Sequence, residues 1–359
     1  MKICLFFIIM LLSICTNAEG IMQFSVKPMN KLEAIVHQLN PNIQDEIYAD
    51  GDIDPMASER FEQFINAHSF DSNKTIVIFN SLGGSLLSGI KLGKVIRNNN
   101  FDTGIGILGK DWQRPTNGVC ASACAYAFAG GNWRYFDDKS EMLGIHQFFD
   151  TENENIGNIG ETQIISSLIV NYLREMGVDP YTFALASKTS SNEMLWLNVG
   201  QASKLGLVNN GVKPTTYEIK LMGLSPYIKI EQIRKDVGTR VLLYCDTGKL
   251  VMEAGIVTTP EASAEHMRSI NRSYIETTSN PHLLDIKSNQ NVTASGHVVW
   301  LIRVLDNSEF LSIANSEKIG IWTENGGVLK WGAILDIKPI RKKLMAFKNS
   351  VNGCKSTPK

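Results

Sequence analysis

Residues 75–85 read TIVIFNSLGGS and join a short apolar run to a turn that contains two adjacent glycines. The run TIVIF, residues 75–79, consists of β-branched and aromatic side chains, which is typical of a strand buried on both faces. A helical pattern follows to about Asn98, with its polar side chains on one stripe. A strand, a glycine turn and a helix form a βα unit, so this stretch predicts an α/β fold.

The segments around this unit continue the alternation of strands and helices as far as about residue 210. We expect strands at 44–53, 103–108 and 142–146, and helices at 57–68, 121–129 and 161–176. The last helix has apolar side chains spaced as i, i+3, i+4 and i+7, and Gly177 ends it. The alternation, which runs to about Asn210, predicts an α/β domain of layered sheet and helices.

The pattern of predicted elements changes beyond residue 213. Short β-rich runs lie at 241–244, 250–257, 297–304 and 328–335, and a basic helix is expected at 340–347. This pattern predicts a smaller β-rich (α+β) domain over residues 213–359, whose role the sequence does not indicate. A chain of 359 residues is long enough for two such domains.

The composition is that of a compact globular protein. Apolar residues make up 43% of the chain and charged residues 20%, which allows a sizeable core and argues against a mainly disordered chain. The 35 basic and 36 acidic residues leave a formal net charge of -1, so no overall field attracts nucleic acid or an anionic membrane. We therefore expect no nucleic-acid partner.

Residues 1–18 have the pattern of a secretory signal peptide. A lysine precedes the apolar run at 3–14, and small residues lead to a cleavage site after Ala18. The run is shorter than the roughly 20 apolar residues that span a bilayer. A lipid on Cys15 stays open, although the isoleucine before it is larger than usual. We expect a lead at 19–42 and a periplasmic or secreted protein without a stable membrane span.

Cleavage would leave four cysteines, Cys120, Cys124, Cys245 and Cys354, in an oxidising compartment. Cys245 ends an apolar run and Cys354 follows the basic helix, so a disulfide between them would hold the C-terminal tail onto the β-rich domain, and we expect this pair. A disulfide between Cys120 and Cys124 is compatible with it and stays open. The spacings lack the paired CxxC pattern of zinc sites, and we expect no metal.

Two short segments, together with the glycine turn, contain the residues that a catalytic site for acyl transfer needs. In residues 118–125, GVCASACA, Ser122 stands where the chain enters an apolar helix, whose N-terminus directs N–H groups at a reacting atom. His146 closes a strand, which is a rigid place for an imidazole. A serine hydroxyl needs a base to take its proton, so a Ser–His pair is the minimum for acyl transfer. Gly83 and Gly84 expose backbone N–H groups, as an oxyanion hole requires.

Four landmarks in this order resemble the ClpP/crotonase superfamily. They are Asn80-Ser81-Leu82-Gly83-Gly84-Ser85, Ala121-Ser122-Ala123, Ile145-His146-Gln147 and Ala202-Ser203-Lys204-Leu205-Gly206-Leu207-Val208. Within the superfamily, the sequence is similar to the ClpP-like and signal-peptide-peptidase-like serine peptidases and their periplasmic relatives. The resemblance spans residues 43–212. Because the superfamily also holds acyl-CoA enzymes and inactive members, the landmarks indicate the fold more specifically than the activity.

The resemblance implies a role for each residue of the candidate site. Ser122 would be the nucleophile and His146 the general base. The N–H groups of Gly84 and Ala123 would stabilise the oxyanion, and Gly83 would shape the turn of the oxyanion hole.

The acid of the triad is where the sequence departs from the family. The resemblance aligns Met194, and no carboxylate, with the family's acid position. Glu193, next to it, and Asp179, upstream, stay open as carboxylates that orient His146. A Ser–His dyad without an acid stays open as well.

We therefore expect an exported ClpP-like serine hydrolase that cleaves peptide or other acyl bonds through an acyl-enzyme on Ser122, without a cofactor. Its substrate would be a peptide or protein, and homo-oligomerisation stays open. The alternative is a non-catalytic module of the same fold that binds a peptide or an envelope partner. An acyl-CoA enzyme is disfavoured because CoA is not expected outside the cytoplasm, and a catalytic cysteine because Cys120 and Cys124 lack redox spacing.

Overall fold

A computed structural model describes residues 20–27, 35, 43–108, 117–148, 159–327, 329–351 and 354. The chain divides into two compact units, unit 1 (Met1–Asn210) and unit 2 (Gly211–Lys359). The expected signal peptide at 1–18, and most of the lead at 19–42, lie outside the described residues. No helix within these described ranges is long and apolar enough to cross a membrane. Strands and helices are mixed along the chain, so the predicted α/β class is correct.

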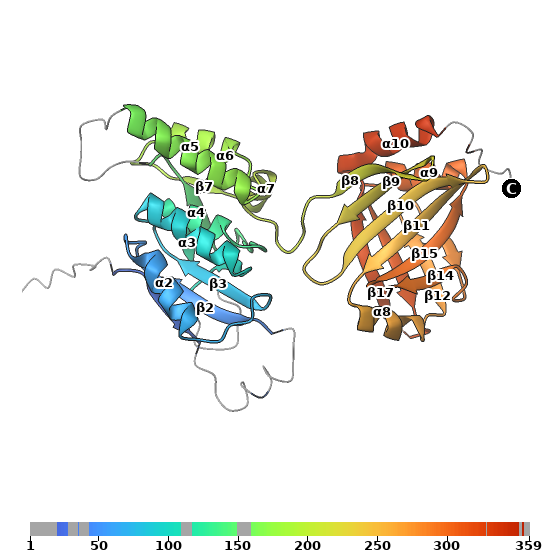
Figure 1. The fold of residues 1–359 in the computed structure, drawn as a ribbon, viewed down its shortest axis with the longest axis horizontal. Coiled ribbons are helices and arrows are strands. Elements are labelled where there is room, and N and C mark those ends of the chain that lie inside the picture. The colour runs from blue at the N-terminus through green and yellow to red at the C-terminus, as the bar shows by residue number, and fades with distance from the viewer. Residues whose placement is uncertain are drawn as a thin grey trace, which may run out of the picture. The chain divides into compact units, whose positions relative to one another are not determined.

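Unit 1 begins with a four-stranded sheet in the order β1-β2-β3-β4 (Figure 1). Its strands are β1 (Gln23–Val26), β2 (Asp45–Asp50), β3 (Thr75–Asn80) and β4 (Asp102–Ile105). β2, β3 and β4 pair in parallel, and β1 pairs antiparallel with β2. Helices α2 (Ala57–Asn66) and α3 (Leu86–Asn98) connect the parallel strands. Val77 and Phe79 of β3 are fully buried, and Ile78 on the other face is 2% exposed, which is why the middle of this strand is apolar.

A second, three-stranded sheet has the order β5-β6-β7. β5 (Val119–Ala121) pairs in parallel with β6 (Met142–Ile145), and β7 (Leu195–Leu197) pairs antiparallel with β6. A parallel bridge between Ser81 and Cys120 joins β5 to the chain that leaves β3. The other helices among the described residues of unit 1 are α4 (Ala123–Ala129), α5 (Ile159–Glu175), α6 (Tyr181–Lys188) and α7 (Val199–Lys204).

Helix α4 is held against α3 by very small side chains. A Cβ atom built on Gly89 of α3 would lie 2.5 Å from the carbonyl oxygen of Ala123, the first residue of α4. The two helices lie side by side (Figure 1), and only glycine permits so close an approach. From α5, the hydroxyl of Tyr172 donates a hydrogen bond of 2.7 Å to the carbonyl oxygen of Tyr126 in α4. Helices on either side of it therefore fix the position of α4.

A buried arginine joins the end of α4 to the loop after α7. The guanidinium of Arg134 donates to the carbonyl oxygens of Gly131, Gly206 and Leu207 at 2.7–3.0 Å. Burial lowers the pKa of Arg134 to about 10, so it remains a cation at neutral pH. The Gly206 and Leu207 landmark thus anchors the fold of unit 1.

The expected elements of unit 1 occur, but several of their ends differ. The helix expected at 121–129 begins at Ala123, because Ala121 still belongs to β5 and the chain turns at Ser122. The strand expected at 103–108 lies at Asp102–Ile105. The expected elements did not include strands β1, β5 and β7 or helices α6 and α7.

Unit 2 contains two antiparallel sheets, in the orders β14-β15-β11-β10-β9-β8 and β13-β12-β16-β17. The larger sheet consists of β8 (Thr216–Met222), β9 (Ser225–Gln232), β10 (Gly238–Asp246), β11 (Lys249–Val257), β14 (Val292–Ser295) and β15 (Val298–Leu305). The smaller consists of β12 (Arg272–Glu276), β13 (Leu283–Ile286), β16 (Lys318–Glu324) and β17 (Lys330–Asp336). Consecutive strands pair through short turns, so much of unit 2 is built from hairpins.

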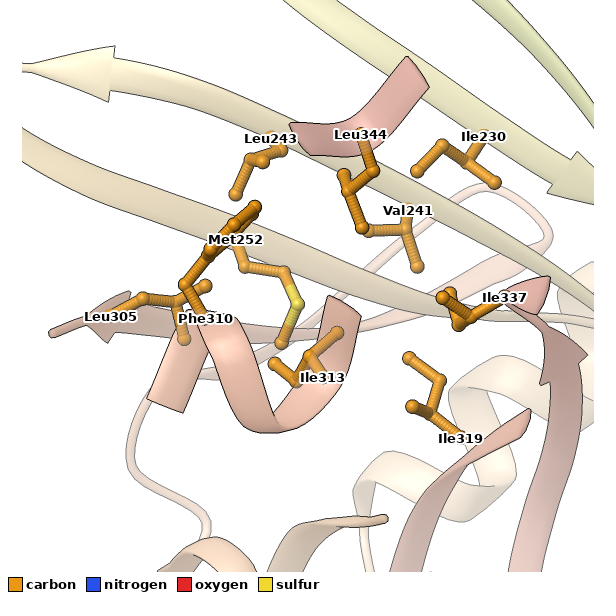
Figure 2. A pocket seen from close by; sticks show the side chains of 10 residues that line it. All are labelled: Ile230, Val241, Leu243, Met252, Leu305, Phe310, Ile313, Ile319, Ile337 and Leu344. Atoms are coloured by element: carbon orange, nitrogen blue, oxygen red, sulfur yellow. The ribbon is translucent and has the colours of Figure 1, made fainter. Parts of the chain in front are cut away.

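The two sheets of unit 2 share one apolar interior, because β17 contacts β9 and β10. The unit also contains α8 (Pro260–Met267), α9 (Asn307–Asn315) and α10 (Arg341–Ser350). A small pocket lies between α9, α10 and the larger sheet (Figure 2). All ten side chains that line it are apolar. We therefore assign this pocket to the core.

The disulfide predicted between Cys245 and Cys354 is present. Its Cα atoms are 5.6 Å apart, and 109 positions separate the two cysteines in the sequence. Cys245 lies in β10 and Cys354 follows α10. The bond therefore ties the residues after the last helix to the larger sheet, which is the connection that the sequence predicted.

Candidate active site

Ser122 occupies a sharp turn between β5 and α4. Its backbone has φ 57° and ψ −123°, a positive φ that is uncommon for a residue with a side chain and costs roughly 1–3 kcal/mol. Its N–H donates to the carbonyl oxygen of Gly144 in β6 at 3.0 Å. The hydroxyl of Ser122, which is half-buried, thus stands at the N-terminus of α4, where the helix dipole is positive.

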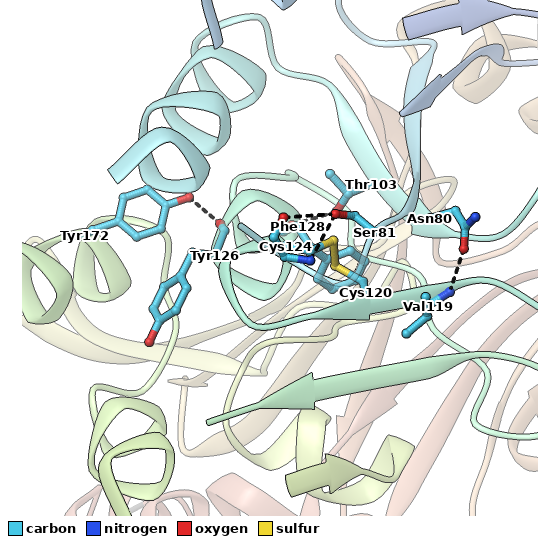
Figure 3. Close-up of a disulfide and its surroundings, with 10 residues drawn as sticks. Asn80, Ser81, Thr103, Val119, Cys120, Cys124, Tyr126, Phe128 and Tyr172 are labelled. Carbon is cyan, nitrogen blue, oxygen red and sulfur yellow. Dashed lines mark hydrogen bonds between the residues drawn. A yellow bond between two sulfur atoms is a disulfide. The ribbon is translucent and has the colours of Figure 1, made fainter. Parts of the chain in front are cut away.

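The disulfide that the sequence left open, between Cys120 and Cys124, encloses this turn (Figure 3). Its Cα atoms are 5.2 Å apart, although a regular helix would hold residues four apart near the upper range of disulfide geometry. The distance is shorter because Cys120 lies within strand β5 and Cys124 within the first turn of helix α4, with the turn at Ser122 between them. Both cysteines are fully buried. The disulfide therefore links strand β5 covalently to helix α4 across the strained turn.

The two adjacent glycines lie against this turn. Gly83 and Gly84 have φ values of 120° and 125°, in a region that residues with side chains rarely adopt. A Cβ atom on Gly83 would lie 2.7 Å from the Cβ of Ser122 and 2.9 Å from the carbonyl oxygen of Ala121. A Cβ atom on Gly84 would lie 2.4 Å from the carbonyl oxygen of Ile53. Both positions therefore require glycine.

Hydrogen bonds from the preceding residues fix the glycine turn. The N–H of Gly83 donates to the Oγ of Ser81 at 3.2 Å, so this N–H group is used within the turn. Asn80 accepts a hydrogen bond of 3.3 Å from the N–H of Val119, which holds β5 beside the turn (Figure 3). This role of Asn80 and Ser81 was not expected from the sequence, although their polar side chains precede the two glycines.

Two backbone N–H groups of the glycine turn and of α4 remain available. The N–H of Gly84 and the N–H of Ala123 have no hydrogen-bond partner among the residues that the structure describes. Ala123 is the first residue of α4, so its N–H lacks an intrahelical acceptor. Donors of this kind at a serine are suited to binding a negatively charged oxygen.

His146 lies directly after β6, the parallel neighbour of β5. Ser122 follows β5 in the same way, so both residues stand at the carboxyl ends of adjacent parallel strands. The side chain of His146 is buried, and this burial lowers its pKa below the ordinary value of 6.5. The imidazole is therefore neutral at neutral pH and can accept a proton.

Met194 stands opposite His146. The last register pair of β6 and β7 is Ile145 with Leu195, so the next residue on each chain is His146 on one side and Met194 on the other. The Cγ of Met194 would lie 2.7 Å from a Cβ built on Gly144, two residues before His146. A thioether side chain thus lies beside Gly144 at this end of β6.

The two carboxylates that stayed open, Glu193 and Asp179, belong to exposed residues. Glu193 is exposed in the turn before β7, and its N–H donates to the carbonyl oxygen of Ser190. Asp179 is also exposed, and its carboxylate accepts a hydrogen bond of 2.9 Å from the N–H of Tyr181 at the start of α6. Asp179 therefore already has a structural role at a helix end. Among the described residues, no group of three or more His, Cys, Asp or Glu side chains is placed to hold a metal ion.

Comparisons with known proteins find similarity only among solved structures, since no family model and no curated protein matches the chain. A membrane-bound stomatin-specific protease is similar with a TM-score of 0.32 and 15% sequence identity, over 45% of this chain and 75% of that one. ClpP1 from Listeria monocytogenes is similar with a TM-score of 0.33 and 16% identity, over 49% of this chain and 94% of that one. Scores this low carry no conclusion about the activity of this chain.

Proposed function

We propose that unit 1 is a serine hydrolase that acts on peptide or other acyl bonds through an acyl-enzyme on Ser122. The observation that carries this proposal is the strained turn of Ser122 at the N-terminus of α4, with the glycine turn pressed against it. A serine at a strained turn from a strand into a helix presents its hydroxyl to a substrate. The strain is maintained by β5, by α3 and by the disulfide, so it serves a purpose beyond packing.

In the proposed reaction, the imidazole of His146 takes the proton of the Ser122 hydroxyl as its oxygen attacks the substrate carbonyl carbon. The carbonyl oxygen becomes an oxyanion and accepts hydrogen bonds from the N–H groups of Gly84 and Ala123. The tetrahedral intermediate collapses, and the leaving group departs with the proton from His146. Water then attacks the acyl-enzyme with His146 again as the base, which releases the acid and restores Ser122.

We also propose that the protein works outside the cytoplasm, in the periplasm or as a secreted protein. Two disulfides support this location, because such bonds persist in oxidising compartments. The signal-peptide pattern at 1–18 supports it independently. The substrate would then be a peptide or protein of that compartment.

Labelling with a fluorophosphonate tests the proposal, because only an activated serine reacts readily with this probe. We expect one equivalent of label on the wild-type chain by intact mass, and none on Ser122→Ala. Ser203→Ala is the matched control, since Ser203 is exposed in α7 of the same unit, and it should label like the wild type. Label on Ser122→Ala would refute the assigned nucleophile.

One observation favours the second candidate function, a non-catalytic module that binds a peptide or an envelope partner. Met194 stands opposite His146, where a triad needs an acid to orient the imidazole. The same labelling experiment separates the two functions. A folded wild-type chain that takes up no label, and that binds peptides equally well with Ser122→Ala, would support the binding module.

A further inference from the structure

Strand β8 forms an open edge of the larger sheet of unit 2. It is the last strand of that sheet and pairs only with β9 among the described strands. All seven of its residues are exposed, including Ile219 at 60% and Leu221 at 68%. Native proteins usually cover or interrupt an edge of this kind, because its free N–H and C=O groups pair readily with another strand.

The turn between β8 and β9 determines which backbone groups face the open edge. Met222 pairs with Ser225 across a two-residue turn that begins at Gly223, which has φ 62°. The pair that flanks such a turn exchanges hydrogen bonds, and hydrogen-bonded positions then alternate along the hairpin. The backbone groups of even-numbered residues in β8 therefore face β9, and those of Tyr217, Ile219 and Leu221 face outward.

The side chains of β8 are self-complementary about Ile219. In an antiparallel pair of two β8 strands centred there, Glu218 of each copy faces Lys220 of the other, and Tyr217 faces Leu221. The outward backbone groups of these centred strands meet one another, so the hydrogen-bond pattern also matches. The charged pairs fall at the positions without hydrogen bonds, where side chains lie closest.

Neighbouring registers lose either the match between outward backbone groups or the pairing of opposite charges. A shift by one position in the pairing sets outward backbone groups opposite inward ones, which breaks the ladder. A shift by two sets Glu218 opposite Glu218, or Lys220 opposite Lys220, and like charges directly opposite destabilise a strand pair. The register centred on Ile219 satisfies both conditions.

We propose that β8 is a dimerisation edge, at which two copies of this chain pair antiparallel through residues 216–222. The resulting interface is isologous, since the same strand contributes from both copies. It joins the two larger sheets into one and places the apolar row of Tyr217, Ile219 and Leu221 beside its own copy. A single strand pair buries less area than the roughly 1,200–2,000 Å² of a stable interface, so the dimer forms reversibly.

Sedimentation equilibrium of the full chain, at concentrations up to about 200 μM, tests the proposal. We expect a monomer–dimer equilibrium with a dissociation constant on the order of tens of micromolar. Glu218→Lys and Lys220→Glu each set like charges opposite one another, and each should weaken the dimer about tenfold or more. Lys249→Glu is the matched control, because it changes the charge equally at an exposed site on β11, and it should dimerise like the wild type.

A mixture of the two edge variants gives the sharpest result. When the Glu218→Lys chain pairs with the Lys220→Glu chain, each lysine at position 218 or 220 faces a glutamate of the other chain. The two variants should therefore form a heterodimer as strong as the wild-type dimer. The double variant with both changes in one chain should recover dimerisation for the same reason. A wild-type chain that stays monomeric over the whole range, or variants that do not recover in the mixture, would overturn the proposal.

Discussion

Gly83 and Ser122 lie so close together that a Cβ atom on Gly83 would come within 2.7 Å of the Cβ of Ser122. The side chain of the serine can occupy its position only while its neighbour has none. The Ser122 turn is itself strained, so it cannot easily move away from an added methyl group. The conformation of the glycine turn and the position of the Ser122 side chain therefore depend on each other.

Gly83→Ala should accordingly damage both stability and reactivity. The positive φ and the steric overlap together should lower the free energy of unfolding by about 2–4 kcal/mol. A displacement of the Ser122 hydroxyl should slow fluorophosphonate labelling about 100-fold. Gly177→Ala is the control, since Gly177 also has a positive φ but no atom within 4 Å of its Cβ position. Gly177→Ala should lower the free energy of unfolding by only about 1–2 kcal/mol and leave the labelling rate unchanged. Equal effects of the two variants would contradict a steric role for Gly83.

The labelling rate should depend on pH through His146. Burial disfavours the imidazolium, so the pKa of His146 lies below its ordinary value of 6.5. Below that pKa the protonated ring cannot take the proton of Ser122, and above it the neutral ring can. The rate should therefore rise with pH and reach half its maximum below pH 6.5.

Rate constants measured between about pH 4 and pH 8 check this expectation. His146→Gln, which removes the titrating group, should label slowly with no such rise. A wild-type midpoint above 6.5 would contradict the neutral base.

The α/β character of the chain was predictable from local patterns, because β3 and α3 each bury a recognisable set of apolar side chains. The position of Ser122 at a turn was also predictable from its small neighbours. Its positive φ was not, since it depends on partners distant in sequence, namely Gly144 and the glycine turn. In unit 2, helix α9 was missed although Asp306 and Glu309 form a capping box that the sequence contains.

The triad acid shows a different limit of sequence reasoning. Proximity along the chain suggested Glu193, which lies in an exposed turn before β7, and its role beside His146 stays a prediction. Asp179 looked equally suitable, and its carboxylate accepts a hydrogen bond from the N–H of Tyr181, the first residue of α6. Which carboxylate approaches an imidazole is decided by tertiary contacts, which a single sequence does not reveal.

The two disulfides should contribute differently to stability and to the reactivity of Ser122. Replacing Cys245 and Cys354 by serine opens a loop with a sequence separation of 109, which should cost about 4–5 kcal/mol in the chain-entropy model. It should leave the labelling of Ser122 unchanged, because both cysteines belong to unit 2. Replacing Cys120 and Cys124 opens a short loop and should cost about 2 kcal/mol, yet it should slow labelling because the strained turn loses this covalent link.

Thermal unfolding and labelling rates of the two double variants check this contrast. Non-reducing peptide mapping of the wild-type chain confirms first that both bonds are closed. Unchanged labelling without the disulfide of Cys120 and Cys124 would mean that β5 and α3 alone hold the turn.

The last prediction concerns Met194. Its position opposite His146 means that a carboxylate placed there could accept a hydrogen bond from the imidazole and stabilise the imidazolium that forms during attack. Met194→Asp should therefore raise the labelling rate about tenfold, because a fixed tautomer and orientation of the base are worth at least that much in serine hydrolases. The change should also raise the pKa of His146 and move the midpoint of the pH profile upward, since a nearby negative charge favours the protonated ring.

Met194→Leu is the matched control: it keeps the apolar contact with Gly144 and should leave both rate and midpoint as they are. A faster rate with an unchanged midpoint would show that the carboxylate acts on something other than His146. No change in either quantity with Met194→Asp, in a chain that remains folded, would show that the base is already oriented by another group, and the absence of an acid at this position would then no longer favour a binding module.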